Sequence, residues 1–393
     1  MAGPALQVDE NLLQFATPRQ REVLEAIRDY GSARKAGSAL GTDINYPSAV
    51  YKAVQKRAAK QGYAPEHDYV HAVPDGFVAK GVSTYYNSEG KPAGQWVKST
   101  IDAERQRELM MASVEAMCLN IKPVAPIAAP KAALEHLLQL YPFYDYHVGM
   151  HAWHKEGGAD WDLKIAEETG LAAMQSLVAS APMAGTAIID IGGDWMHYDG
   201  HAPITPTHGH ILDADGRFAK MVDVSIRLIR QMVSLALQKH SNVTLLIQEG
   251  NHDLASSLWL RKMFACLYEG EPRVTVHESE LPYYAIQWGN TMLGFHHGHL
   301  KKWEGLPLLF AAQFAAIWGA THRRYIHTGH RHHKLVREFD GVQVIQHQTM
   351  AAPDAHSSRG GYHSERGLMA VTYHAKYGEV ATTTLTPQML EAA

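Results

Sequence analysis

The sequence predicts an α/β fold, in which a sheet is covered by helices, preceded by a small N-terminal helical domain. Three observations support this prediction. From about residue 134, short apolar runs rich in β-favouring residues alternate with longer segments of helical periodicity. Short polar blocks directly follow several of these runs, at the point where a strand would end. The first 100 residues instead contain three short helical patterns and one pair of strand patterns.

The composition excludes several classes of protein. With 393 residues, 46% of them hydrophobic, the chain is long enough for two or three domains with a large core. Its net charge of −4 excludes a protein that is basic throughout, so any basic surface must be local. Cys118 and Cys266 are too few for a disulfide framework or a four-cysteine zinc site.

The sequence also lacks the usual signals for secretion or membrane insertion. Residues 1–20 do not contain a basic segment followed by an apolar run, so we expect no secretory signal. We find no apolar stretch of about 18 residues, so we expect no membrane partner. So small a number of cysteines fits a reducing compartment. We therefore expect a cytoplasmic protein, in a bacterium or in a phage-infected host cell.

The first helical patterns lie in residues 17–60. Thr17, Pro18 and Gln20 form the pattern of a capping box with proline in the first turn of a helix. Glycines end this helix and the short second one, and the third helix is predicted over 47–60. Three short helices, the last two joined by a tight turn, are the outline of a helix-turn-helix. Residues 77–97 then show two strand patterns around a turn, which would form the wing of a winged helix.

The helical segment carries a local excess of basic residues. Residues 17–63 contain nine lysines and arginines and four acidic residues, a local charge of +5 against −4 overall. Lys52, Lys56 and Lys60 follow one another at one-turn spacing on the third predicted helix. Such a stripe would contact DNA phosphates. The alternative is a solvated helix face in a small packing or oligomerisation domain, which leaves a homodimer open.

The predicted domain organisation has three parts. Residues 1–100 form the helix-turn-helix-like domain. Residues 101–133 comprise a connecting helix and a stiff stretch rich in proline and alanine, which we predict as the linker. Residues 134–393 form the α/β domain, with predicted strands at 185–192, 243–248, 291–296, 324–328 and 342–348, and predicted helices at 162–180, 217–239, 256–268 and 306–318.

Five short blocks in this region carry the residues that a pair of divalent cations needs. Carboxylate, amide and imidazole groups recur in them, and all but the first block follow a clean apolar run. Ligands at strand ends lie on stiff elements and can converge on one point. The candidate ligands are Asp145, His147, Asp194, Asn251, His297, His330 and His332.

The spacing within the blocks supports metal binding. Asp145 and His147 are two residues apart, so in an extended segment they point to the same side and can share a cation. Gly193 before Asp194 lets the backbone turn sharply, so that this carboxylate can bridge two ions. Two carboxylates leave a cation pair with net positive charge, which attracts phosphate. Two cations also lower the pKa of a water between them, and the resulting hydroxide is the expected nucleophile.

This order of motifs resembles that of the calcineurin-like metallophosphoesterase superfamily, over about residues 140–380. The resemblance implies a four-layer α/β/β/α sandwich with the site at the C-terminal ends of its strands. It implies that His252 acts as the acid that protonates the leaving oxygen, or stabilises the transition state. Matched motif by motif, it implies one cation on Asp145, His147 and His332, a second on Asn251, His297 and His330, and Asp194 as the bridge.

Two further residues concern the substrate. The block Gly193 to His197 resembles the Gly-Asp-x-x-His motif of the double-strand-break repair nucleases in this superfamily, which implies that His197 orients the DNA phosphate. The alternative is an ordinary histidine next to the site. Arg359, in a polar loop after the last strand of the motif, is predicted to hold a non-scissile phosphate, and the alternative is a solvent-exposed loop.

We therefore expect a metal-dependent phosphodiesterase that cleaves DNA, as an exonuclease or a DNA-processing nuclease. The fusion of a helix-turn-helix-like region to this domain resembles phage or prophage phosphoesterases. The alternative is a phosphomonoesterase or a cyclic-nucleotide or other small-molecule phosphodiesterase, with the N-terminal domain used for assembly. Mixed histidine, aspartate and asparagine ligands suit manganese first, with iron, zinc or magnesium as alternatives.

Overall fold

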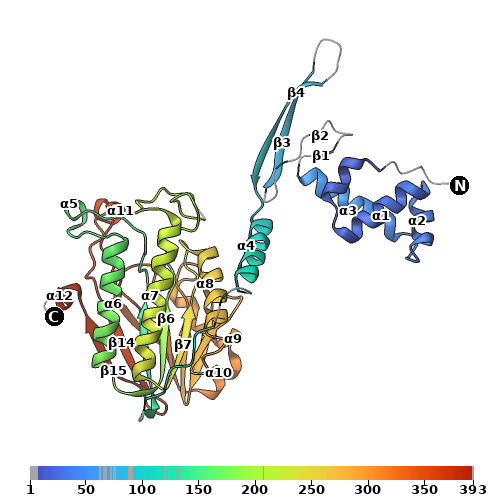
Figure 1. Ribbon diagram of the computed structural model, residues 1–393. Coiled ribbons are helices and arrows are strands. Elements are labelled where there is room, and N and C mark those ends of the chain that lie inside the picture. Colours follow the sequence, from blue (N-terminus) through green and yellow to red (C-terminus); the bar gives the residue numbers. More distant parts are fainter. Residues whose placement is uncertain are drawn as a thin grey trace. The chain divides into compact units, whose positions relative to one another are not determined.

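The structure is a computed structural model that describes residues 8–61, 63–64, 69–70, 73, 77–86, 92–118, 121, 123–130, 133–206 and 208–391. The chain divides into two compact units, one up to Ala112 and the other from Ser113 onward (Figure 1). The division falls within helix α4 (Ala103–Cys118). Within the described residues, no helix has the length and apolar character that crossing a bilayer requires.

The N-terminal unit begins with a 3₁₀ helix, η1 (Glu10–Phe15), and three helices, α1 (Pro18–Tyr30), α2 (Ala33–Ala39) and α3 (Tyr46–Lys60). The Thr17 hydroxyl accepts the N–H of Gln20, and the Gln20 side chain accepts the N–H of Thr17, which confirms the predicted capping box. These helices share one apolar core, formed by Leu12, Phe15, Val23, Leu24, Ala26, Ile27, Ala33, Ala36, Val50, Val54, Ala58 and Tyr63.

A long antiparallel hairpin follows in the same unit. After the short pair β1 (Tyr63–Ala64) and β2 (Tyr69–Val70), strands β3 (Phe77–Tyr86) and β4 (Pro92–Ile101) pair over their whole lengths. This confirms the predicted pair of strands, while the predicted turn at 87–90 lies outside the described residues. The winged-helix assignment of this unit stays a prediction.

The second unit contains two sheets. The six-stranded sheet has the order β15-β14-β5-β6-β7-β8, with β5 to β8 parallel, and the five-stranded sheet has the order β12-β13-β11-β10-β9. The strands of the first sheet are β5 (Leu134–Phe143), β6 (Ala184–Ile191), β7 (Asn242–Ile247), β8 (Val274–His277), β14 (Leu368–His374) and β15 (Gly378–Leu385). Those of the second are β9 (Tyr284–Trp288), β10 (Thr291–Phe295), β11 (Arg323–Thr328), β12 (Leu335–Phe339) and β13 (Val342–Gln346).

Alternation along the strands determines how the two sheets pack. Leu293 of β10 faces the core between the sheets. The preceding residue, Met292, faces the helices on the other side of the five-stranded sheet. Leu140 of β5 and Ile188 of β6 enter the same intersheet core. The outer core of the five-stranded sheet packs on Phe310 and its neighbours in helix α9 (Leu306–Gln313).

Helices cover the outer face of the six-stranded sheet as well. Helix α7 (Phe218–Lys239) packs on β6 and β7, α6 (Leu163–Ser180) packs on α7 and β15, and α8 (Leu254–Leu267) packs on β7 and β8 (Figure 1). The order of layers is therefore helices, six-stranded sheet, five-stranded sheet, and α9 with α10 (Ala315–Ala320). The predicted α/β fold is confirmed in this form.

The proline- and alanine-rich stretch predicted as a linker packs on the second unit in part. The N–H of Val124 donates to the carbonyl of Leu267 at 2.8 Å. The Arg273 guanidinium donates to the carbonyls of Ile127 at 2.9 Å and Ala128 at 3.0 Å. Because side chain and backbone groups of the second unit hold these residues, this part of the stretch is not a free spacer.

Candidate metal centre

The seven predicted ligands come together at the C-terminal ends of strands from both sheets. Each ligand lies in the loop directly after its strand. Since β5, β6 and β7 are parallel neighbours, their C-terminal ends meet at one edge of the sheet. The parallel strands β10 and β11 supply the rest. The ligands are Asp145 and His147 after β5, Asp194 after β6, Asn251 after β7, His297 after β10, and His330 and His332 after β11.

Among the described residues, three groups of three side chains are each compact enough for one cation: two of them contain a carboxylate, and the third consists of His147, His197 and His252. In the first cation group (Asp145, His147 and His332), His332 Nε2 lies 3.3 Å from both Asp145 Oδ1 and His147 Nε2. In the second cation group (Asp194, His297 and His330), His297 Nε2 lies 3.2 Å from Asp194 Oδ2. The ligand atoms of each group lie within 4.8 Å of one another.

The two groups adjoin each other. His297 Nε2 is 3.8 Å from Asp145 Oδ1 of the first cation group, and Asp145 and His297 are completely buried. Three buried atoms here have no hydrogen-bond partner among the described residues: Asp145 Oδ1, Asn251 Oδ1 and His297 Nε2. Leaving such atoms unpaired in a protein interior costs about 1–3 kcal/mol each. A carboxylate, an amide and an imidazole acceptor are the donor set of a transition metal, so these residues fit a cation pair.

The backbone at the ligands is strained. Among the described residues, the non-glycine positions with positive φ are five, and all five are predicted ligands: Asp145 (51°), His147 (49°), Asp194 (50°), His330 (72°) and His332 (57°). A left-handed conformation at a residue with a Cβ costs about 1–3 kcal/mol and concentrates at functional sites. Strain confined to the ligands is an independent indication that their positions serve chemistry rather than stability.

Two glycines allow the loops to approach. A Cβ on Gly329 would lie 2.5 Å from Asp145 Oδ2, and a Cβ on Gly250 would collide with Asp194 Oδ1 and its backbone N. Both distances are shorter than real Cβ atoms tolerate. Glycine before Asn251 and before His330 is therefore needed so that the two ligand loops can reach the carboxylates.

Asp253, the last residue of its block, holds two loops together. Its carboxylate accepts the N–H groups of Asp194 (3.2 Å), Trp195 (2.8 Å), Met196 (3.2 Å) and Gly250 (2.9 Å). Asp253 is completely buried and belongs to neither cation group. It therefore fixes the backbone around Asp194 from below and does not act as a ligand.

Other hydrogen bonds orient the ligand side chains. His297 Nδ1–H donates to the carbonyl of Gly192 at 2.9 Å, which directs Nε2 to the carboxylates. Asp145 Oδ2 accepts the N–H of His330 at 2.8 Å, which leaves Oδ1 for a cation. Burial lowers the pKa of His297, but the nearby Asp194 and Asp145 carboxylates outweigh it and raise the pKa to about 10. The same negative charge attracts a metal ion.

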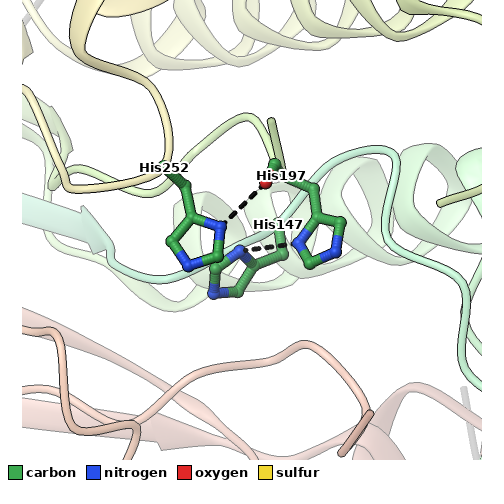
Figure 2. A group of neighbouring side chains, drawn as sticks. All are labelled: His147, His197 and His252. Atoms are coloured by element: carbon green, nitrogen blue, oxygen red, sulfur yellow. Dashed lines mark hydrogen bonds between the residues drawn. The ribbon is translucent and has the colours of Figure 1, made fainter. Parts of the chain in front are cut away.

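His252 and His197 lie against the first cation group (Figure 2). His252 Nδ1–H donates to the carbonyl of His197 at 2.8 Å, and His252 Nε2 lies 4.0 Å from Asp194 Oδ2. His197 Nδ1 is 3.2 Å from His147 Nδ1. Burial, and next the neighbouring His252, lower the pKa of His197 to about 3, so its imidazole is neutral. The structure thus brings both predicted catalytic histidines to the cluster.

Of the neighbouring histidines His296, His297 and His299, His297 belongs to a cation group with a carboxylate. His296 donates from Nδ1 to the carbonyl of Pro282 at 3.0 Å and lies in neither cation group. The ring of His299 lies 5.3 Å from that of His297, next to the cluster and outside both groups. Strand alternation explains this result, because neighbouring residues leave β10 toward opposite faces.

Arg359 is not brought to the cluster. The cluster opens into a cavity of about 1060 Å³, and Arg359 does not line it. Arg359 is the exposed last residue of helix α11 (Ala355–Arg359) and lines a separate hollow with His151, Trp153 and Asp213. The arginines that line the main cavity are Arg331 and Arg366. Sequence analysis missed both, although Arg331 stands between two predicted ligands.

The predicted DNA-binding lysines lie in the N-terminal unit. Lys52, Lys56 and Lys60 are all exposed on α3, whose opposite face buries Val50 and Val54 in the helical core. The stripe is therefore accessible, as the spacing predicted. Its role in DNA binding stays a prediction.

No protein family and no curated protein matches the chain by sequence. Similar solved structures include a conserved uncharacterised protein of Streptococcus pneumoniae described as a predicted phosphoesterase (9% identity, 64% of this chain, 99% of that chain, TM-score 0.26). Another is a novel archaeal phosphodiesterase (12% identity, 63% of this chain, 99% of that chain, TM-score 0.32). A third is zinc-complexed Vps29 of Entamoeba histolytica (11% identity, 63% of this chain, 98% of that chain, TM-score 0.25). All three TM-scores lie below 0.5, so these similarities do not establish a common fold.

Proposed function

We propose that this chain is a metal-dependent phosphodiesterase of the calcineurin-like metallophosphoesterase superfamily, with two divalent cations at its centre. The observation that carries the proposal is the contact between the two cation groups: His297 Nε2, which lies 3.2 Å from Asp194 Oδ2 in its own group, is 3.8 Å from Asp145 Oδ1 of the first group. The order of the motifs and the strain confined to the ligands support it. Manganese is the cation proposed first, with iron, zinc and magnesium as alternatives that fit the donor set.

When bound, a pair of cations neutralises charge on the phosphate and supplies a nucleophile from water at neutral pH. Asp194 belongs to the second cation group: its Oδ1 accepts the N–H of His252 at 2.8 Å, and its Oδ2 faces His297. These contacts fix both carboxylate oxygens. We propose Asp194 as the bridging ligand, as the order of the motifs implies.

His252 is proposed as the acid that protonates the leaving oxygen. Its Nδ1–H is held by the carbonyl of His197, so the proton available for transfer is at Nε2. Nε2 lies 4.0 Å from Asp194 Oδ2, and His252 lines the cavity. A positioned acid of this kind contributes about 10²–10⁴-fold to a rate.

His197 is proposed to orient the phosphate. If His147 binds a cation through Nε2, its proton resides on Nδ1 and is donated to His197 Nδ1, 3.2 Å away. Neutral His197 then carries its own proton on Nε2. His197 lines the cavity, and its Nε2 is buried. The backbone of Asp213 also lies near this ring. Its N–H therefore suits a phosphate oxygen, as in the double-strand-break repair nuclease branch.

The proposed substrate is DNA, cleaved in an exonuclease or DNA-processing reaction. The support is the exposed lysine stripe on α3 in a locally basic, helix-turn-helix-like unit. The second candidate is a small phosphodiester or phosphomonoester, favoured by the burial of the ligands beneath a cavity of about 1060 Å³. In that case the N-terminal unit serves assembly. We also propose that this protein is cytoplasmic and of phage or prophage type.

Hydrolysis of bis(p-nitrophenyl) phosphate and of linear DNA tests the proposal. We expect manganese-dependent release of p-nitrophenolate, its loss in EDTA and its return when Mn²⁺ is added back. Single-stranded DNA, double-stranded DNA and RNA are compared under the same conditions. Hydrolysis of p-nitrophenyl phosphate alone would favour the second candidate. Turnover that persists in EDTA after dialysis would contradict the metal-dependent mechanism.

The lysine stripe has its own test. Replacing Lys52, Lys56 and Lys60 together with alanine should weaken DNA binding and flatten its salt dependence. Each lost phosphate contact lowers the slope of log K against log salt by about 0.7–0.9, so the slope should fall by about 2–3. Fluorescence anisotropy of a labelled oligonucleotide at several salt concentrations measures this slope.

The control variant replaces three exposed lysines of the second unit, Lys301, Lys302 and Lys376, which changes net charge by the same amount. It should leave the slope near that of the wild type. An equal loss of slope in both variants would mean that overall charge, and not α3, binds DNA.

A further inference from the structure

The cavity above the cation groups has two walls that the metal motifs do not supply. One wall is a segment around residues 203–212, and the other is the loop at 350–366, after β13. Residues of both segments line the same cavity as the candidate ligands. Their side chains therefore contact whatever is attached to a phosphate that reaches the cations.

The first wall presents an exposed isoleucine from a fixed backbone. Ile204 and Ile211 form an antiparallel bridge, and the N–H of Leu212 donates to the carbonyl of Pro203 at 2.9 Å. The N–H of Thr205 donates to the carbonyl of His210 at 2.9 Å, which closes the turn. Ile211 lines the cavity with its side chain 88% exposed. Such an apolar group on a rigid hairpin is available to a ligand.

The second wall presents an exposed tyrosine in the same way. Helix α11 ends in a Schellman motif: Gly361 has φ 71°, its N–H donates to Ser358, and the Tyr362 N–H donates to Ser357 at 3.0 Å. The residue at this position usually packs on the third-last helical residue, but that residue is Ser357. Tyr362 therefore stays 67% exposed and lines the cavity.

Two flat imidazoles extend the first wall. The rings of His208 and His210 stack at 5.7 Å between centroids and 25° between planes, and both line the cavity. The upper cavity thus offers flat and apolar surfaces above a floor of metal ligands. A planar ring attached to the phosphate matches these surfaces, because aromatic and apolar side chains bind the faces of nucleobases regardless of sequence.

The charges of the walls disfavour additional phosphates. Apart from the candidate ligands, the described residues that line the cavity include three carboxylates, Asp213, Asp354 and Glu365, and two guanidinium groups, Arg331 and Arg366. The Arg366 guanidinium already donates to the carbonyl of Met350 at 2.7 Å. A surface for a double helix needs several basic groups along its phosphates, and these walls lack that excess. They suit one uncharged nucleoside.

We infer that the cavity walls form a nucleoside subsite, in which Tyr362 and Ile211 contact the base carried by the scissile phosphate. The substrate is then an unpaired nucleotide at a strand end or a small nucleotidyl ester, not a base-paired segment. This inference rests on the proposed phosphodiesterase function, for which the walls supply the specificity.

The experiment compares two esters with the same leaving group. Thymidine 5′-(p-nitrophenyl phosphate) carries a nucleoside, and methyl p-nitrophenyl phosphate does not. We expect wild-type protein in Mn²⁺ to prefer the nucleotidyl ester in kcat/KM. Tyr362→Ala and Ile211→Ser should each lower that preference at least about fivefold, mainly through KM, because stacking on one aromatic side chain contributes about that much or more.

The controls are exposed apolar residues away from the cavity. Tyr377 is 58% exposed and Leu308 is 77% exposed, and neither lines the cavity. Tyr377→Ala and Leu308→Ser should keep the wild-type preference. Unchanged preference in Tyr362→Ala and Ile211→Ser would overturn the subsite, and so would an equal loss on both esters.

Equilibrium binding separates this inference from the proposed function. Thymidine 5′-monophosphate and methyl phosphate are titrated into the Mn²⁺-loaded protein by calorimetry. Tighter binding of the nucleotide that is lost in Tyr362→Ala supports the subsite, even if neither ester is hydrolysed. Absence of hydrolysis would contradict only the proposed phosphodiesterase function and not the subsite. Equal affinity for both ligands, or no binding of the nucleotide, would overturn the subsite.

Discussion

Asp194→Asn is expected to abolish both cation binding and turnover. Asp194 lies beside His297 at 3.2 Å, so its charge serves the second cation group and, as the proposed bridge, the first. Removing a residue that only orients a ligand weakens metal affinity by about 10–100-fold, and loss of a shared ligand charge should exceed that. Loss of a single transition-state contact lowers kcat by about 10²–10³-fold. We therefore expect kcat on bis(p-nitrophenyl) phosphate to fall by at least about 10³-fold in Asp194→Asn.

The measurement is metal content by elemental analysis, together with kcat on the same preparation. Asp190→Asn is the matched control, because Asp190 is buried on β6, the strand that precedes Asp194, and accepts a hydrogen bond from Gln248 instead of joining a cation group. Burial raises the pKa of Asp190 to about 7, so an amide resembles its protonated form. Two bound cations and normal turnover in Asp194→Asn would refute the bridging role.

His252→Gln is expected to separate catalysis from metal binding. His252 belongs to neither of the two cation groups that contain a carboxylate, although it forms a third compact group with His147 and His197, and its Nδ1–H is donated to the carbonyl of His197. We expect kcat to fall by about 10²–10⁴-fold while both cations stay bound. The fall should be smaller for p-nitrophenyl esters than for a thymidine dinucleotide, because p-nitrophenolate leaves without help from an acid.

His154→Ala is the control for this variant. His154 is exposed and pairs with Asp160 at 2.9 Å, away from the main cavity. It should behave as wild type on both substrates. Loss of metal in His252→Gln would make His252 a ligand, and an equal fall on good and poor leaving groups would remove its role as the acid.

The candidate site was largely accessible to sequence analysis because its signals are local. Carboxylate, amide and imidazole residues stand directly after apolar runs, and the parallel neighbours β5, β6 and β7 then bring them together. The least regular of these runs contains Pro142, which usually argues against a central strand. Here β14 pairs with β5 only through residues 137–140, so Pro142 lies beyond that ladder, and on its other side it stays in register with Asp190 of β6.

Other features depended on contacts that no local pattern reveals. Arg359 was predicted at the substrate, but α11 places it in a neighbouring hollow, because the direction of a short helix is set by tertiary packing. The walls with Ile211 and Tyr362 lack any periodic pattern. The stretch predicted as a linker is bound by Arg273, about 145 residues away in sequence. Long-range hydrogen bonds of this kind are invisible in spacing.

The origin of the ligands in both sheets has a mechanical consequence. Asp145, Asp194 and Asn251 follow strands of the six-stranded sheet, whereas His297, His330 and His332 follow strands of the five-stranded sheet. Cations held by both sets cross-link the two halves of the sandwich at one rim. Separation of the halves there must release the ions first, so metal occupancy and the local opening of this edge are coupled equilibria.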